Sequence, residues 1–195
     1  MFLYPGGTII DSTTEGYLFF YNFFSNLGEW TAKNAMDNFS SALLFNLSML
    51  ILALSYTLFY MSYYKFFLDE KRSKIFIRIS FVFVMVSMIC FVLIAIFSSE
   101  NATFQLHVFF VKIAGRSFML YSIFQSLAVV YNSKSSNKMI FSNLFFTIIL
   151  FFFILIMEFG PNPFKDNESL FIQVISQKII VFSILIYFYT QVREI

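Results

Sequence analysis

Five long apolar runs constrain this chain more than any other feature of its sequence. They cover residues 41–64, 75–97, 104–131, 139–157 and 170–190. A helix of roughly 20 mostly apolar residues crosses the hydrocarbon core of a bilayer. The strands of a membrane β-barrel are instead segments of about ten residues in which apolar and polar residues alternate. The runs are continuous and too long for such strands. They predict an all-α, polytopic transmembrane helix bundle with five spans.

The composition indicates that hydrocarbon is the solvent of this bundle. Apolar residues make up 59% of the 195 residues, charged residues only 12%, and 31 residues are Phe. A soluble chain of this length could not bury so many apolar side chains in its core. About a quarter of the residues in soluble domains are charged, which is twice the share found here. The single cysteine, Cys90, excludes a disulfide scaffold, and the net charge of +2 offers no basis for binding nucleic acid.

The basic residues predict the orientation of the spans. Eight of the thirteen lie in or beside the connections 65–74 and 131–138 and the C-terminal tail. The connections 98–107 and 158–170 and the first forty residues are mainly acidic instead. By the positive-inside rule, we expect a cell-membrane protein with its N-terminus outside and its C-terminus in the cytoplasm.

Residues 1–39 form a distinct outer segment of the same structural domain as the bundle in 40–195. Ser12 and Glu15 have the spacing of a capping box, and residues 16–30 have an apolar and a polar helical face. The polar face carries Asn22, Asn26 and Glu29. We expect an amphipathic helix here, either re-entrant within the outer half of the bundle or lying at its outer surface.

The same segment carries an ordered set of motifs within residues 4–48: YPGG, then Asp11, GY, NFFSNLG and NFSSALLFN. In this order they resemble the N-terminal signature of an uncharacterised bacterial and archaeal family of multi-pass membrane proteins related to the FRAG/DRAM/Sfk group. The chain departs from the family at Asn26, where members typically have Asp. Members also usually have a further helix ahead of YPGG. The resemblance implies a lipid-facing role, since the eukaryotic relatives are linked to lipid remodelling and lipid asymmetry, but it names no reaction.

Three basic residues fall inside the expected spans. Lys112 and Arg116 share one helical face, roughly 12 and 18 Å along their helix, and Lys178 lies roughly 12 Å along the last span, below Gln177. A central Lys or Arg costs about 2.5–3.5 kcal/mol unless it is paired or hydrated. No Asp or Glu lies within the five expected runs, which leaves three explanations. The partner is Asp11, Glu15 or Glu29 of the outer segment, the partner is a bound anion such as a lipid phosphate, or the lysines reach the outer interface along their apolar stems.

The sequence offers little catalytic chemistry. A catalytic zinc site takes three protein ligands, and the chain has one His and one Cys. Neither a G-x-S-x-G elbow nor a glycine-rich nucleotide loop occurs, so we expect no metal and no cofactor.

The preferred function is therefore non-enzymatic. We expect an anionic lipid or amphiphile to bind in an outer-leaflet cavity lined by Lys112, Arg116 and Lys178, with Gln177, and covered by the outer segment through Asp11, Glu15, Asn22, Asn26 and Glu29. Two alternatives stay open. One is a lipid-remodelling enzyme that uses the outer carboxylates with His107. The other is a scaffold subunit whose charges pair with another membrane protein.

Overall fold

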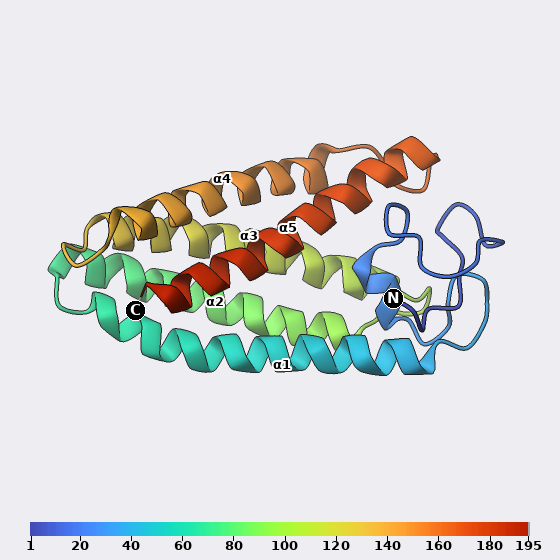
Figure 1. Ribbon diagram of the computed structural model, residues 1–195, viewed down its shortest axis with the longest axis horizontal. Helices are drawn as coiled ribbons and strands as arrows, with labels where there is room; N and C mark the ends of the chain where they lie inside the picture. Colours follow the sequence, from blue (N-terminus) through green and yellow to red (C-terminus); the bar gives the residue numbers. More distant parts are fainter. Residues whose placement is uncertain (195) are drawn as a thin grey trace.

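The computed structural model describes residues 1–194 and is a bundle of five long helices (Figure 1). The helices are α1 (Phe39–Tyr63), α2 (Lys71–Ile96), α3 (Phe104–Val130), α4 (Asn137–Phe159) and α5 (Asn167–Arg193). No strand occurs among the described residues; the short elements are 3-10 helices η1 (Phe24–Gly28) and η2 (Tyr64–Phe67). The prediction of an all-α bundle of five spans is confirmed, and the helix ends lie within a few residues of the predicted ones.

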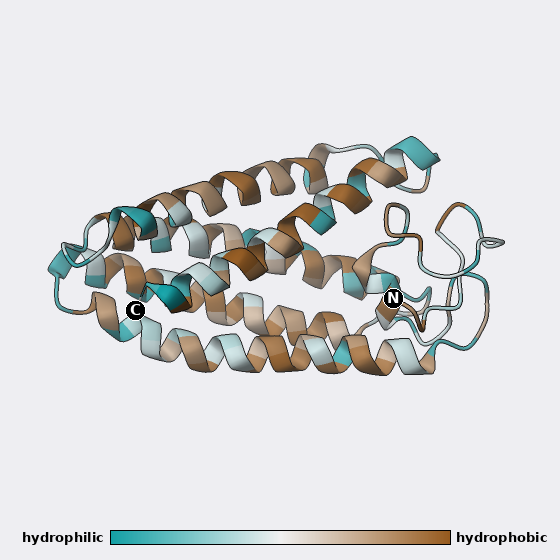
Figure 2. Ribbon diagram, viewed as in Figure 1, coloured by the Kyte–Doolittle hydropathy of each residue, from teal (hydrophilic) through white to brown (hydrophobic). Residues whose placement is uncertain are grey.

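All five helices are long and apolar enough to cross a membrane. Their apolar side chains point outward along most of their length, as the exposed Phe141, Phe152 and Ile186 illustrate. Figure 2 shows the hydrophobic middle of the bundle between more hydrophilic ends. A helix satisfies its own backbone hydrogen bonds, which is the condition for exposing such a surface to lipid. The chain is accordingly a multi-pass membrane protein.

A repeat of small polar residues joins α2 to α3. Ser73, Ser80 and Ser87 are spaced by seven residues, and each hydroxyl donates to a backbone carbonyl of α3. The acceptors belong to Ala128, Tyr121 and Ala114, at 2.9, 3.1 and 3.3 Å. Small residues let two membrane helices approach closely, and their hydroxyls bond across the interface. This repeat of serines holds α2 and α3 in close contact along much of their length.

Residues 1–38, which we call the N-terminal cap, cover one end of the bundle, and we call this end the cap end. The connections 97–103 and 160–166 lie at the cap end too, whereas the C-terminus lies toward the opposite end (Figure 1). Isolated bridges join Gly6 to Glu15 and Thr31 to Asp37. Gly28 rests against α1 so closely that a Cβ there would lie 2.5 Å from the ring of Phe45.

The amphipathic helix expected over residues 16–30 is not present. Only the five-residue 3-10 helix η1 forms within it, and Ser12 and Glu15 make no capping box. The carboxamide oxygen of Asn22 accepts from the backbone N–H of Leu18, and that of Asn26 accepts from Phe23, at 2.9 and 2.8 Å. These side chains take the place of helical backbone partners, which is the usual way in which Asn disrupts a helix.

The half of the bundle away from the cap is held by a buried polar network. Gln191 on α5 accepts from the hydroxyl of Tyr56 on α1 at 2.7 Å and donates to the hydroxyls of Tyr121 and Tyr187 at 3.1 and 3.0 Å. Tyr187 in turn donates to Asn143 on α4 at 2.5 Å. The network therefore ties four helices together through polar groups that lipid could not satisfy.

Candidate functional site

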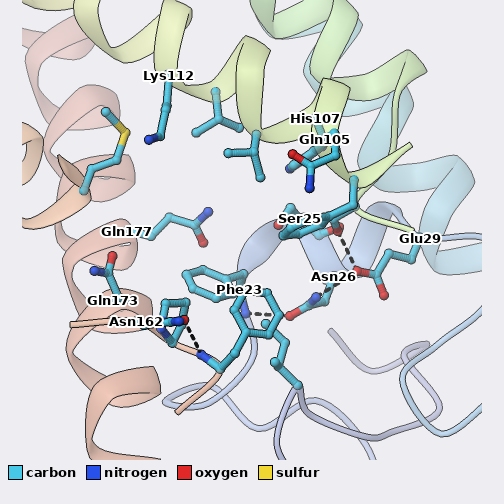
Figure 3. A pocket seen from close by; sticks show the side chains of 18 of the residues that line it. Phe23, Ser25, Asn26, Glu29, Gln105, His107, Lys112, Asn162, Gln173 and Gln177 are labelled. Carbon is cyan, nitrogen blue, oxygen red and sulfur yellow. Dashed lines mark hydrogen bonds between the residues drawn. The ribbon is translucent and has the colours of Figure 1, made fainter. Parts of the chain in front are cut away.

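A cavity of about 530 Å³ lies at the cap end, between the N-terminal cap, the first turns of α3, the connection 160–166 and the start of α5 (Figure 3). Its volume is in the range of ligand-binding pockets. Apolar side chains form one wall: Phe104, Val108, Val111, Met157 and Phe164. Polar side chains form the rest of the lining, including Ser25, Asn26, Glu29, Lys33, Ser99, Gln105, His107, Lys112, Gln173 and Gln177. The cavity is therefore amphipathic.

The cavity exists because α4 is shorter than its neighbours at this end. Ser126 of α3 hydrogen-bonds Thr147 of α4 at 3.0 Å, and Arg116 lies beside Glu158 near the end of α4. From Arg116, α3 continues a further 12 residues to Phe104, about 18 Å at 1.5 Å per residue. Figure 1 shows α4 ending short of the start of α5 at the cap end. Residues 160–164 of the irregular connection line the cavity, where non-helical backbone is tolerated.

Glu158 is the partner of the two cations of α3. Its Oε1 accepts from Nε and Nη2 of Arg116 at 2.9 and 2.7 Å, and its Oε2 lies 3.6 Å from Nζ of Lys112. The side chain of Glu158 is 17% exposed, against 41% for Lys112 and 59% for Arg116. Two cations share one carboxylate, so the cluster keeps one uncompensated positive charge. Lys112 also lines the cavity, which places that charge at the cavity wall.

This pairing corrects the expectation that the partner of Arg116 comes from the N-terminal cap or a bound anion. It also corrects the placement of residue 158 outside the spans, because α4 continues to Phe159 and includes Glu158 in its last turn. The predicted run ended at Met157 because hydropathy falls there. A helix can continue past the end of its apolar run. Glu158 lies in that extra turn of α4, where its carboxylate forms ion pairs with the neighbouring helix α3.

Lys178 does not line the cavity; it holds the N-terminal cap against α5. Its Nζ donates to the carbonyl of Asn22 at 2.9 Å and to the hydroxyl of Tyr17. The same ammonium lies 3.6 Å from the ring centroid of Phe24 and 5.1 Å from that of Phe19. Desolvated cations gain about 2 kcal/mol from an aromatic face. The predicted role of Lys178 as a ligand-binding cation is therefore replaced by a clamp on the cap.

Glu29 is almost fully buried at the edge of the cavity and has partners within the protein. Its Oε1 accepts from Asn26 Nδ2 at 2.9 Å and from Ser99 Oγ at 2.5 Å, and it forms an ion pair with Lys33 at 2.9 Å. Burial raises the pKa of the Glu29 carboxyl, and the Lys33 ammonium and the hydrogen bond from Ser99 oppose that rise. Lys33 is thereby neutralised, so Lys112 is the lining cation that carries the excess charge.

His107 lines the same cavity and is held by the residue that follows α2. Its Nδ1 lies 2.8 Å from the carbonyl oxygen of Phe97, to which it donates. An Nδ1 that donates to a carbonyl leaves Nε2 as the acceptor in the neutral ring. The cavity therefore has one carboxylate, Glu29, and one imidazole in its lining.

The remaining predicted residues divide into two groups. Gln177 and Asn26 line the cavity, and the side-chain Oε1 of Gln177 accepts from the backbone N–H of Phe24 at 2.8 Å. Asn22 is buried inside the cap, and Arg116, Asp11 and Glu15 lie away from the cavity lining. Asp11 accepts from the hydroxyl and backbone N–H of Thr13, which hold the pKa of its carboxyl below the ordinary value.

Several lining residues were not predicted from the sequence, among them Lys33, Ser99, Gln105 and Gln173. Gln173 lies four residues before Gln177 and shares its helical face, so helical spacing gives a weak signal for it. Gln105, Ser99 and Lys33 carry no such signal, because tertiary structure brings them to the cavity. Within residues 1–194 no cluster of His, Cys, Asp and Glu is arranged to hold a metal ion.

Comparison of the chain with protein-family models, with curated proteins and with solved structures finds no match.

Proposed function

We propose that this membrane protein binds an anionic lipid or another anionic amphiphile in the cavity at its cap end. The observation that carries the proposal is the excess positive charge of the Lys112–Glu158–Arg116 cluster at the wall of an amphipathic cavity. Unpaired charge at membrane depth is expensive and usually functional. An anionic headgroup at Lys112 would neutralise that charge.

The apolar wall supports an amphiphile over a small soluble anion. Val108, Val111 and Met157 lie beside Lys112 on the cavity surface, in a helical region that is apolar enough to contact lipid. A phosphate alone would leave this wall facing water. A ligand with a charged head and an acyl chain would contact both the ammonium and the apolar side chains, which matches the composition of small-molecule sites.

The predicted orientation places this cavity toward the outer leaflet. Most basic residues lie at the end opposite the cap, in the α1–α2 and α3–α4 connections and the C-terminal tail, which is the distribution of cytoplasmic segments. The N-terminus would then be outside and the C-terminus in the cytoplasm of the cell. The resemblance of residues 4–48 to the FRAG/DRAM/Sfk-related family agrees with a lipid ligand.

Glu29 and His107 favour an enzymatic alternative, because both line the cavity. They would have to act as an acid–base pair on a lipid headgroup. Glu29 already accepts hydrogen bonds from two side chains and forms an ion pair with Lys33. The other two carboxylates of the cap that the sequence suggested, Asp11 and Glu15, do not line the cavity. The alternative therefore depends on a single carboxylate, and we place it second to binding.

The scaffold alternative depends on the exposure of Arg116. Its guanidinium faces outward next to Glu158, where a carboxylate of another membrane protein would also fit. Co-purification of a stoichiometric protein partner with the wild type, lost in Arg116→Gln, would favour this alternative.

Native mass spectrometry of the purified full-length protein tests the proposal. We expect wild type to retain an anionic lipid, and Lys112→Gln to lose most of it because the excess charge disappears. Lys165→Gln is the matched control, since Lys165 is an exposed lysine at the same end that does not line the cavity. Equal lipid retention by Lys112→Gln and wild type would refute the proposal.

A further inference from the structure

The polar lining of the cavity contains more hydrogen-bonding capacity than a bare phosphate can use. Gln173 donates from Nε2 to the carbonyls of Ile156 and Pro161, both at 3.0 Å, so its Oε1 is an available acceptor. Gln177 has the reverse arrangement: its Oε1 accepts from Phe24, which leaves Nε2 as an available donor. The two carboxamides are one helical turn apart on α5 and face the same space (Figure 3).

The opposite side of the cavity adds groups of both kinds. The carboxamide of Gln105 and the hydroxyl of Ser25 have no hydrogen-bond partner within residues 1–194, and both line the cavity. Gln105 offers a donor and an acceptor, and a serine hydroxyl offers both. Free donors and free acceptors therefore lie on both sides of the cavity, and Lys112 enters it from α3 (Figure 3).

A hydroxyl group is the partner that such a lining matches. It donates one hydrogen bond and accepts two, whereas an ionised phosphate oxygen only accepts. A phosphate would engage Lys112 and Gln177 but would leave the acceptor of Gln173 without a donor. Burying an acceptor against a ligand that cannot donate is unfavourable, and it discriminates against ligands that lack the hydroxyl.

We infer that the headgroup bound in this cavity is polyhydroxylated as well as anionic, as in a lipid whose phosphate carries a polyol. The acidic group lies at Lys112, and the hydroxyls lie among Gln105, Gln173 and Gln177. This inference rests on the proposed function, because it specifies the headgroup of the same ligand.

The test compares two probe lipids with identical acyl chains and one negative charge each. Phosphatidylglycerol has two headgroup hydroxyls, and phosphatidylethanol has none. The full-length protein is delipidated and titrated with each lipid under native mass spectrometry. We expect wild type to bind phosphatidylglycerol about tenfold more tightly, which is the effect of losing one or two hydrogen bonds.

Two variants locate that preference. Gln105→Leu removes a side chain without protein partners, so we expect the fold to be unchanged and the preference to fall at least threefold. Gln177→Glu keeps the acceptor for Phe24 and removes the donor, so it also lowers the ratio between the lipids. Lys165→Gln should leave the ratio unchanged.

The outcomes separate the two proposals. Equal binding of both lipids by wild type overturns the polyol inference and leaves the anionic-lipid proposal standing. Absence of binding to either lipid refutes the proposed function itself. A preference that survives unchanged in both Gln105→Leu and Gln177→Glu assigns it to another part of the protein and also overturns the inference.

Discussion

The two ends of the bundle bury polar groups in opposite ways. Away from the cap, Tyr56, Tyr121, Tyr187 and Gln191 satisfy one another across α1, α3 and α5, and no charged group takes part. At the cap end, two cations share the carboxylate of Glu158, and polar side chains line part of an amphipathic cavity. A closed network stabilises one arrangement of helices, whereas a site with spare charge and spare donors is suited to a ligand.

The largest effect should come from opening the closed network. Gln191→Leu removes the amide that bonds three tyrosine hydroxyls, so those buried groups lose partners. We expect the free energy of unfolding to fall by about 2–3 kcal/mol, measured by denaturation in mixed micelles. Gln105→Leu is the matched change at the cap end and should alter it by less than about 0.5 kcal/mol. Equal losses in the two variants would contradict the distinction between the two ends.

The clamp on the cap should show the next largest effect. Lys178→Met removes the ammonium that bonds Asn22 and Tyr17 and lies over the ring of Phe24. We expect a loss of about 2 kcal/mol that is confined to the cap. Limited proteolysis should therefore cut within residues 1–38 sooner, while the helices stay protected. Lys165→Met serves as the control, and protection of the cap that matches wild type in Lys178→Met would argue against a clamp.

Substitution of Glu158 tests the charged cluster at the cap end, because it should change both stability and lipid binding. Glu158→Gln leaves Lys112 and Arg116 without their carboxylate, and stability should fall because an unpaired cation at membrane depth is costly. The cavity becomes more positive, so retention of an anionic lipid should increase several-fold. Lys112→Gln should have the opposite effect on lipid retention. Weaker lipid binding in Glu158→Gln, with the fold intact, would show that the carboxylate itself contacts the ligand.

The smallest effect is a pH dependence that arises from Glu29. Its folded pKa lies above the ordinary value of 4.5, so the folded state binds the proton more readily than the unfolded state does. Stability should therefore rise as the pH falls from neutral through the raised pKa, and this gain should be complete below 4.5. The difference between wild type and Glu29→Gln in thermal unfolding temperature, measured against pH, isolates this contribution. A difference that does not vary with pH would contradict it.

The spans followed from the sequence because hydrocarbon imposes a simple rule on length and polarity. The bounds of α3 differ from the predicted run by only one residue at its end. The fold of the cap did not follow, because it depends on side chains that replace backbone partners. The side chain of Asn22 donates a hydrogen bond to the carbonyl of Gly7, 15 residues earlier in the chain, and no periodic sequence pattern predicts such a contact.

The candidate site was predictable only in part. Lys112 and Gln177 stand out as polar residues in apolar runs, and both line the cavity. The partner of Arg116 was missed because Glu158 lies 42 residues away on a different helix, one residue beyond the predicted run. The contact between Lys178 and Tyr17 spans 161 residues of sequence and depends on how the cap folds. Contacts of this kind are set by tertiary structure.

Photo-crosslinking tests the central claim, that the cavity at the cap end is a binding site for an anionic amphiphile. An anionic phospholipid with a diazirine beside its headgroup is incorporated with the protein in nanodiscs, and adducts are mapped by mass spectrometry. We predict that they concentrate on residues 104–112 and 160–177 and diminish in Lys112→Gln. Adducts spread over exposed Phe141, Phe145 and Phe152 of α4, and unchanged in that variant, would show that the lipid only surrounds the protein.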